Sequence, residues 1–354
     1  MPKDETPSNR PATPVQYVRL HDLDARLEGL IVIHSTALGP AAGGCRLWPY
    51  ASLDAAFDDA VRLAEGMSYK NAMAGLPLGG AKAVIRRPEG EFDRTCLFSA
   101  FGRAVERLEG RYITAEDVGT CVADMDVVAQ ATRHVVGRDR GAGRAGGNPA
   151  PWTALGVFHA MRAGARAALG SELAGRTVAV QGLGQVGSQL CLLLAEAGAN
   201  LIVADIDPAR ARETAQQLGA RLVASEDIAL YDADIFAPCA LGGVLTRRTV
   251  ASMKARLICG AANNQLADLG AAADLARRGI VYVPDYVANA GGIISAAAEW
   301  MEENEETVAV RVAQIGLRTA IILEEALRTR RSPATVADRI AENIIAGMAP
   351  PGGL

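Results

Sequence analysis

The stretch TVAVQGLGQVGSQL, residues 177–190, decides how the second half of this chain folds. Its opening residues are apolar and partly β-branched, so they predict a buried strand. Gly182, Gly184 and Gly187 then form G-x-G-x-x-G, where the strand ends and an apolar helix begins. In this pattern the first glycine permits a tight turn and the second lets the backbone approach a pyrophosphate. The third allows close packing of helix on strand.

The residues that follow fit a dinucleotide. The helix N-terminus at Gln185 and Val186 would hold the phosphates. The next apolar run, LIVAD, ends in Asp205, whose carboxylate can accept hydrogen bonds from ribose hydroxyls and would repel a 2′-phosphate. The stretch therefore predicts a dinucleotide site and favours NAD over NADP. Arg210 and Arg212 keep NADP open, and a fold of this type without a ligand is the alternative.

Apolar runs recur around this motif. They alternate with helical patterns, which predicts a parallel sheet covered on both faces. The runs are TVAV, LIVAD, RLVA, DIFAPC, RLICG and IVYVPD. A helix is expected over 153–169. A long helical pattern begins near 292 and includes the acidic run EENEE as a solvated face, and a last amphipathic helix is expected over 332–347.

The first half of the chain also predicts a mixed α/β structure. Strands are expected at 29–34 and 81–88, and helices at 93–109 and 52–66, the last closed by Gly66 in the C-cap position. The fold class is therefore α/β, with an N-terminal α/β substrate domain, a Rossmann-type dinucleotide-binding domain and a cleft between them.

The glycine-rich stretch GRDRGAGRAGGNPAP, residues 137–151, suggests the boundary between the two domains. We expect a substrate-binding and oligomerisation domain over 1–148, with the C-terminal helices of 325–354 folding back onto it. The Rossmann domain is expected over 149–324.

Composition excludes several classes of protein. The 354 residues carry a formal net charge of −4, which favours neither nucleic acid nor an anionic membrane surface. No apolar run is long enough to span a membrane. The polar tail of residues 1–14 lacks a signal-peptide core, and a second loose tail is expected at 349–354. Six cysteines without a CxxC pair predict reduced thiols in a cytoplasm, and the four scattered histidines predict no metal site.

Two lysines stand in an otherwise uncharged stretch, GMSYKNAMAGLPLGGAK, residues 66–82. Lysine is seldom fully buried unless it is paired. Burial favours the neutral amine, which suits proton chemistry. The alternative is that Lys70 and Lys82 extend to water from a half-buried segment.

Several long motifs together resemble the amino-acid dehydrogenases, the group that contains the leucine, valine and phenylalanine enzymes, with glutamate dehydrogenase more distant. The resemblance covers about residues 15–345. The motifs are LGPAAGGCR, GMSYKNAMAGLPLGGAK, GRYITAEDVGT, DMDVV, QGLGQVG, FAPCALGG, GAANNQLAD and PDYVANAGG. The resemblance implies a homo-oligomer that uses NAD to convert an L-amino acid and water reversibly into a 2-oxo acid and ammonia.

The resemblance also implies roles for particular residues. Lys82 matches the lysine that deprotonates the attacking water, and Asp117 matches the aspartate that exchanges a proton with the substrate amino group. Lys70 matches the lysine that holds the substrate carboxylate. Gly43 and Gly44 would bring backbone groups close to the reacting carbon. The presence of both proton-transfer side chains argues against an NAD-binding protein without activity.

Three further positions match polar contacts of the family. Asn263 would lie near the substrate carboxylate and the cofactor, Thr153 beside the nicotinamide amide, and Asn289 against cofactor or substrate. Simpler interpretations stay open here. Asn263 could be a turn residue, Thr153 a helix cap, and Asp117 a loop cap.

Substrate choice depends on a few small side chains. By resemblance, Ala42, Ala115, Ile293 and Ala296 line the side-chain pocket. One methylene is worth only about 1–3 kcal/mol of discrimination, so small differences in and around the pocket easily shift the substrate choice. The sequence favours a branched-chain substrate of the leucine or valine type, with phenylalanine as the alternative.

Overall fold

The computed structural model of the chain describes residues 16–138, 141 and 143–348, so the two tails expected at the termini lie outside it. Backbone contacts divide the chain into two compact units. The first contains residues up to Ser68 together with Leu78–Val135, and the second contains Tyr69–Pro77 and everything from Val136. The domain limits expected at 148 and 325 stay predictions, because a division by contacts does not test which segments move together.

The first unit is built on a mixed sheet whose strands run in the order β1, β2, β5, β3, β6. Strands β1 and β2 and strands β2 and β5 pair antiparallel, whereas β3 and β4 both pair with β5 in parallel. The strand bounds are β1 Gln16–Asp22, β2 Leu27–Ser35, β3 Ala41–Ala42, β4 Cys45–Trp48, β5 Gly79–Arg86 and β6 Tyr112–Ile113.

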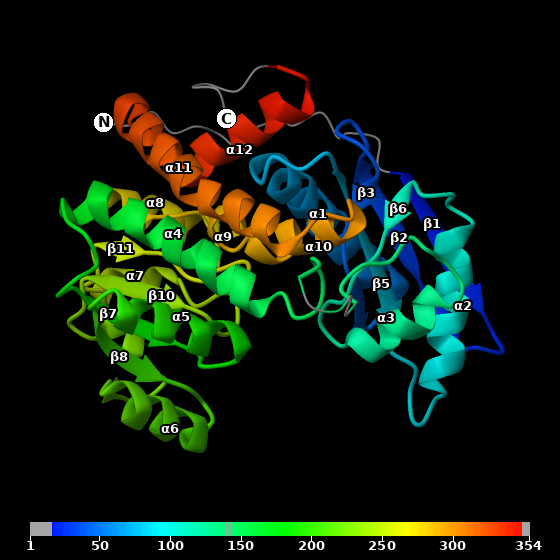
Figure 1. The fold of residues 1–354 in the computed structure, drawn as a ribbon, viewed down its shortest axis with the longest axis horizontal. Helices are drawn as coiled ribbons and strands as arrows, with labels where there is room; N and C mark the ends of the chain where they lie inside the picture. The colour runs from blue at the N-terminus through cyan, green and yellow to red at the C-terminus, as the bar shows by residue number, and fades with distance from the viewer. Residues whose placement is uncertain (1–15, 139–140, 142, 349–354) are drawn as a thin grey trace. The chain divides into compact units, whose positions relative to one another are not determined.

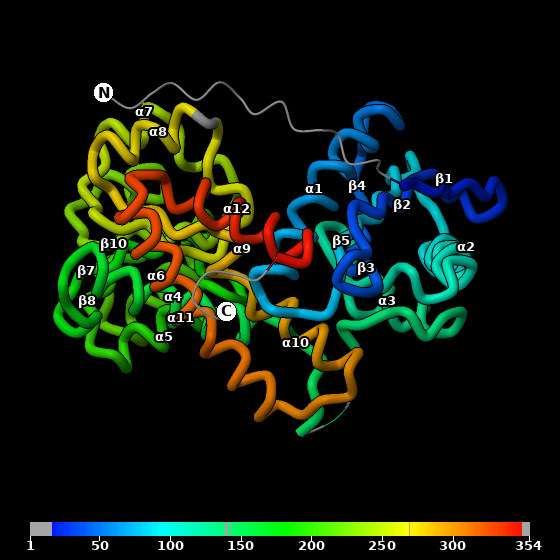
Figure 2. The backbone as a smooth tube through the Cα atoms, turned by 90° about the horizontal axis from the view of Figure 1, so that it is seen from above, coloured from blue at the N-terminus to red at the C-terminus, as the bar shows by residue number. Residues whose placement is uncertain are grey.

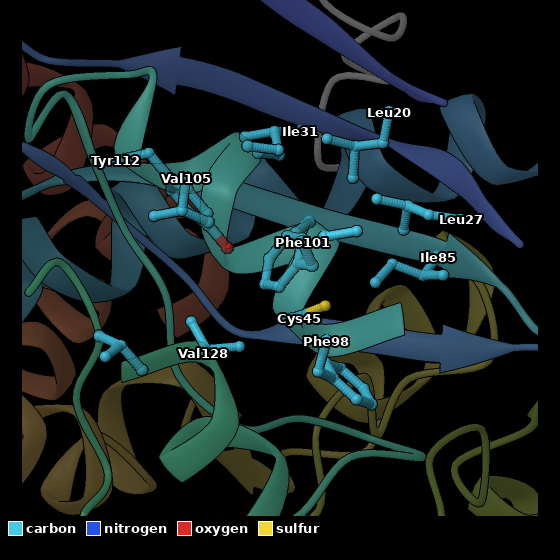
Figure 3. Close-up of a cluster of buried hydrophobic side chains, with 14 of the residues drawn as sticks. Leu20, Leu27, Ile31, Cys45, Ile85, Phe98, Phe101, Val105, Tyr112 and Val128 are labelled. Atoms are coloured by element: carbon cyan, nitrogen blue, oxygen red, sulfur yellow. The ribbon is translucent and has the colours of Figure 1, made fainter. Parts of the chain in front are cut away.

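Helices cover both faces of this sheet. Helix α2, Arg94–Glu106, packs on one face beside α3, Val122–Ala129. Figure 3 shows Phe98, Phe101 and Val105 of α2 beside side chains of the strands. On the other face, small residues of helix α1 pack against alternate strand positions, namely Ala56, Ala60 and Ala64 against Leu30, Val32 and Val84.

Helix α1 is longer than the sequence predicts. It runs over Leu53–Met73 and passes straight through Gly66, so the expected C-cap at Gly66 is wrong. A glycine inside a helix costs only about 1 kcal/mol relative to alanine. Beyond Gly66, buried side chains such as Tyr69 and Met73 outweigh that cost. The chain leaves the helix at Gly75, whose φ is +67°.

The second unit contains a fully parallel six-stranded sheet in the order β12, β11, β10, β7, β8, β9. Counted from its first strand, the order is 3-2-1-4-5-6, that of the Rossmann dinucleotide-binding fold. The chain order reverses between β7 and β10, which lie side by side. The strands are β7 Thr177–Gln181, β8 Asn200–Ala204, β9 Arg221–Leu222, β10 Ile235–Pro238, β11 Leu257–Ile258 and β12 Val281–Tyr282.

Helices lie on both faces of this sheet as well. Figure 1 shows α4 and α5 along one face, and Gly164 of α4 contacts Leu257 of β11 there. On the other face, Val250 of α7 and Leu275 of α8 share a core cluster with Phe236 of β10. The helices are α4 Ala150–Leu169, α5 Gln185–Glu196, α6 Pro208–Leu218, α7 Arg247–Ser252, α8 Leu269–Arg277 and α9 Asp285–Ala288, with a short 3₁₀ turn η1 Ile228–Leu230.

The long helical pattern expected from residue 292 is two helices. Helix α10, Gly291–Trp300, ends before a turn in which Glu302 adopts a φ of +57°, and Figure 2 shows the change of direction. Asn304 then caps α11, Glu305–Thr329, by accepting from the Thr307 N–H. The acidic run therefore contains a helix break rather than one solvated helix face.

The last helix, α12, spans Pro333–Ile345 and begins at the expected cap, Ser332. Among the residues described, no helix combines the length and the apolar character that crossing a membrane requires.

Candidate active site

The double glycine between β3 and β4 shapes the backbone around Lys82. The two strands pair with β5 on either side of the interruption, through Ala42–Gly80 and Cys45–Ala83. A Cβ on Gly43 would lie 1.7 Å from the Ala81 carbonyl oxygen, so only glycine fits there. A Cβ on Gly44 would lie 2.9 Å from the Asp117 side chain. These glycines therefore bring backbone close to both Lys82 and Asp117.

Lys82 and Asp117 form a buried ion pair in the first unit. Lys82 Nζ lies 2.8 Å from Asp117 Oδ2, and the lysine side chain is 6% exposed. Extension of Lys82 to water is therefore excluded, and the Asp117 carboxylate binds cations rather than capping its loop. Burial favours the neutral acid, but Lys82 and Arg46 outweigh burial and hold the pKa of Asp117 below its usual value.

The loop that carries Asp117 is fixed on both sides. The Asp117 N–H donates to the Thr120 hydroxyl, which itself donates to the Cys45 carbonyl. Farther along, the Arg94 guanidinium donates to both carboxylate oxygens of the buried Asp124 and to the Gly119 carbonyl. The carboxylate of Asp117 is thus presented from a rigid loop.

Arg46 is a site residue that the sequence analysis missed. Its Nε donates to Asp117 Oδ2 at 3.0 Å, and its Nη1 donates to Asp59 Oδ2, also at 3.0 Å. Tyr50 and Arg62 donate to Asp59 as well. The signal in the sequence is a charged residue directly after GGC, between the apolar residues Cys45 and Leu47. The structure shows that both of these neighbours are buried.

Lys70 belongs to the second unit, in the last turn of α1. Its charge acts on Asp285 at the start of α9. Burial raises the pKa of Asp285, while a hydrogen bond from the Gln265 N–H and the Lys70 charge oppose that rise. The ammonium of Lys70 therefore lies close enough to Asp285, which follows β12, for the two charges to interact.

The glycine loop after β7 has the geometry that its sequence predicts. Gly182 adopts a φ of +91°, and a Cβ on Gly187 would lie 1.9 Å from the Gly182 carbonyl oxygen. A Cβ on Gly184, in contrast, would have nothing within 4 Å. Gly184 is the N-cap of α5 and supplies no side-chain cap, so the first N–H groups of that helix at Gln185 and Val186 are available to phosphates.

Asp205 lies at the end of β8, where its carboxylate supports the glycine loop. Oδ2 accepts from the Leu183 N–H at 2.6 Å, and Oδ1 accepts from the Asp207 N–H at 2.8 Å. Burial opposes ionisation, but these two bonds and Arg210 hold the pKa of Asp205 below its usual value. The side chain is thus an anion fixed beside the loop.

Asn263 and Asn289 meet in the second unit. Asn289 Nδ2 donates to Asn263 Oδ1 at 2.7 Å and to the Ala261 carbonyl. The buried Asn289 Oδ1 accepts no hydrogen bond from the described residues, which fits a ligand donor at this place. Asn264 beside them has a φ of +53°, so this segment is also a turn. Thr153 donates to the Pro149 carbonyl, which leaves its oxygen able to accept.

The four expected pocket residues lie two in each unit. In the first, Ala42 ends β3, and Ala115 follows β6 and accepts from the Cys45 N–H. In the second, Ile293 and Ala296 stand one turn apart on α10. Nothing in either unit assigns these side chains to a substrate, so their role stays a prediction.

The Rossmann strand order, the glycine loop and the open helix N-terminus together define a class, the dinucleotide-binding proteins. Comparison with known protein families identifies a smaller group within this class. Residues 15–134 match the family described as Glu/Leu/Phe/Val dehydrogenase, dimerisation domain. Residues 150–209 and 207–329 match the family described as Glutamate/Leucine/Phenylalanine/Valine dehydrogenase.

Individual relatives agree with these matches. A leucine dehydrogenase of Bacillus subtilis is 46% identical, covering 94% of this chain and 92% of that protein. A valine dehydrogenase of Streptomyces virginiae is also 46% identical, covering 92% of each. The crystal structure of L-tryptophan dehydrogenase from Nostoc punctiforme matches with a TM-score of 0.83 at 40% identity, covering 94% of this chain and 96% of that one. The chain belongs to the Glu/Leu/Phe/Val dehydrogenase family and is an amino-acid dehydrogenase, and its cofactor is a nicotinamide dinucleotide.

Proposed function

We propose that this enzyme catalyses the reversible oxidative deamination of a branched-chain L-amino acid. The amino acid, NAD⁺ and water become the 2-oxo acid, ammonium, NADH and a proton. The observation that carries the proposal is the buried ion pair of Lys82 and Asp117 beside Gly43 and Gly44. An amine and a carboxylate held apart from bulk water can each move one proton in such a reaction.

Each side chain then has a separate task. Lys82 in its neutral form takes a proton from the water that attacks the imino carbon. Asp117 exchanges a proton with the nitrogen of the substrate. Lys70 binds the substrate carboxylate as a point charge. The nicotinamide, when bound, accepts the hydride from the α-carbon.

The cofactor that we propose is NAD. Gly184 leaves room for the pyrophosphate at the start of α5, and Asp205 is held ionised where a ribose would lie. A 2′-phosphate there would meet a fixed negative charge. Asn263, Asn289 and Thr153 provide polar atoms for the nicotinamide half, and the unpartnered Asn289 Oδ1 supports that assignment.

The proposed substrate class rests on the relatives and on small side chains. The relatives above include proteins named leucine dehydrogenase and valine dehydrogenase, which favours a branched-chain substrate over phenylalanine. Ala42, Ala115, Ile293 and Ala296 would contact its side chain. We also propose a homo-oligomer in a reducing cytoplasm, supported by the match to a dimerisation domain and by six unpaired cysteines.

The test is NADH formation at alkaline pH from L-leucine, L-valine, L-phenylalanine, L-tryptophan and L-glutamate, with NAD⁺ and NADP⁺ compared. We expect the highest kcat/KM for leucine or valine with NAD⁺. If an aromatic substrate has the highest value, the substrate class is wrong and the reaction stands. If no amino acid is turned over while NADH still binds, the proposed reaction is wrong.

A further inference from the structure

Two cations share one oxygen of Asp117. Lys82 Nζ lies 2.8 Å from Oδ2, and Arg46 Nε donates to the same Oδ2 at 3.0 Å. Both of these contacts are made to Oδ2 and not to Oδ1. A carboxylate anchored through one oxygen presents the other in a fixed direction, because rotation about its Cβ–Cγ bond would break both contacts.

Arg46 is itself held from the opposite side. Its Nη1 donates to Asp59 Oδ2 at 3.0 Å, and Tyr50 donates to that same oxygen at 2.6 Å. Arg46, Asp59 and Asp117 have side chains that are only 18–20% exposed. A planar guanidinium can bridge two carboxylates in this way, whereas a lysine ammonium at one point cannot hold both in the same geometry.

From this geometry we propose that Arg46 is a positioning residue for Asp117, and that Asp59 fixes Arg46 in place. The proposal rests on the proposed role of Asp117 in proton exchange with the substrate nitrogen. Arg46 holds Oδ2 so that Oδ1 is the oxygen that receives the proton. It also keeps a second positive charge on Asp117, so the carboxylate stays ionised when Lys82 is neutral.

Loss of Arg46 should therefore weaken the charge compensation of Asp117 as well as lower the rate. Without the guanidinium, the pKa of Asp117 rises towards its usual value, because one of two compensating cations is gone. The titratable and charged groups that face Asp117 are Lys82 from β5, Arg46 and Cys45 from β4 and Tyr112 from β6.

The experiment compares Arg46→Gln and Arg46→Lys with Arg62→Gln. Arg62 is the matched control because it also donates to Asp59, at 2.6 Å, but makes no contact with Asp117 and is 57% exposed. The kcat and KM for the best substrate are measured at alkaline pH, together with the dissociation constant of NADH and the melting temperature.

Arg46→Gln should lower kcat by about 10- to 100-fold, the effect of a misplaced catalytic group, with the KM for the amino acid and the affinity for NADH nearly unchanged. Arg46→Lys should recover part of the rate, and Arg62→Gln should resemble wild type. The inference is overturned if Arg46→Gln matches Arg62→Gln in kcat. If the Arg46 variants do not fold, Tyr50→Phe decides: a loss of rate of a few fold supports the inference, and wild-type kinetics overturn it.

A failure of the proposed function can be distinguished from a failure of the role proposed for Arg46. If wild type turns over no amino acid, or if Asp117→Asn keeps full activity, the reaction or the role of Asp117 is wrong whatever Arg46 does. If wild type is active and Asp117→Asn is not, the Arg46 variants test the positioning role alone.

Discussion

In the reaction that we propose, single residues of the first unit set the chemistry through burial and charge. Lys82 is 5% exposed, and a buried ion is stable only when it is paired. Asp117 pairs with both Lys82 and Arg46, so loss of a proton from Lys82 leaves Asp117 compensated. The same arrangement that permits burial thus permits proton transfer.

The first prediction concerns Lys82. Lys82→Gln should lower kcat by about 10²–10⁴-fold, the usual contribution of a general base. The fold should persist because Asp117 keeps Arg46. Lys254→Gln is the control, since Lys254 is exposed in the second unit. Steady-state rates and NADH binding measure the effect. A Lys82→Gln variant with a rate like that of Lys254→Gln would contradict the assignment.

The second prediction concerns the stability contributed by Asp117. Its pKa is held below the usual value of 3.8 in the folded protein. The stabilisation is therefore complete above pH 3.8 and is lost as pH falls through the lower folded value. We expect wild type to be more stable than Asp117→Asn at pH 7 and the difference to narrow as pH falls below 3.8. Urea unfolding at each pH measures it, and a constant difference would refute it.

At this scale the sequence predicts part of the site. Lys82 and Asp117 stand in motifs that could be read directly, and the structure brings them within 2.8 Å. Arg46 could not be assigned, because its two partners lie 13 and 71 positions away in sequence. The bridge between Cys45 and Glu116 is one of the backbone contacts that bring the segment of Asp117 beside Arg46.

Among the helices and loops, the places where an element begins or ends were the hardest features to predict. The expectation that Gly66 ends a helix failed because burial of later side chains was not visible in the local pattern. The break before α11 was also not predicted. The pattern continues through residues 301–304, while the capping of Asn304 and the turn at Glu302 depend on backbone geometry.

The third prediction uses Gly66. A Cβ at this exposed helical position would have nothing within 4 Å, so Gly66→Ala should raise the free energy of unfolding by about 0.5–1 kcal/mol. Chemical denaturation of the two proteins checks this. Destabilisation instead would mean that Gly66 adopts a positive φ and ends the helix after all.

The fourth prediction separates two glycines of the loop after β7. Gly187→Ala places a Cβ 1.9 Å from the Gly182 carbonyl oxygen, and overpacking of this kind costs about 1–3 kcal/mol. Gly184→Ala meets nothing in the protein, so it should keep the wild-type melting temperature while weakening NADH binding. Thermal unfolding and NADH titration distinguish them. Equal melting temperatures for both variants would refute the packing role of Gly187.

For the whole molecule, the sequence predicted the α/β class and the Rossmann half from the recurrence of apolar runs, and the six parallel strands confirm that. The mixed sheet of the first unit was less predictable. Strands β3 and β6 contain two residues each, too short to carry a periodic pattern. Strand β3 forms because it pairs with the longer β5, and β6 pairs in turn with β3.

The fifth prediction is the oligomeric state. Residues 15–134 match a dimerisation domain, so the purified protein should have a mass that is at least twice that of one chain. Light scattering coupled to size-exclusion chromatography measures it over a range of concentrations. A single-chain mass at micromolar concentration would contradict the prediction.

The position of Asp205 limits how this enzyme can acquire a new cofactor. One carboxylate supports the turn at Leu183 and, in the NAD site that we propose, would also recognise the ribose. A substitution that removes its charge to admit a phosphorylated ribose also removes an acceptor from the loop. A change of preference towards NADP should therefore require at least two coupled substitutions, one to admit the phosphate and one to restore the support. In evolution or in design, substitution of Asp205 alone should therefore give an enzyme that works less well with either cofactor.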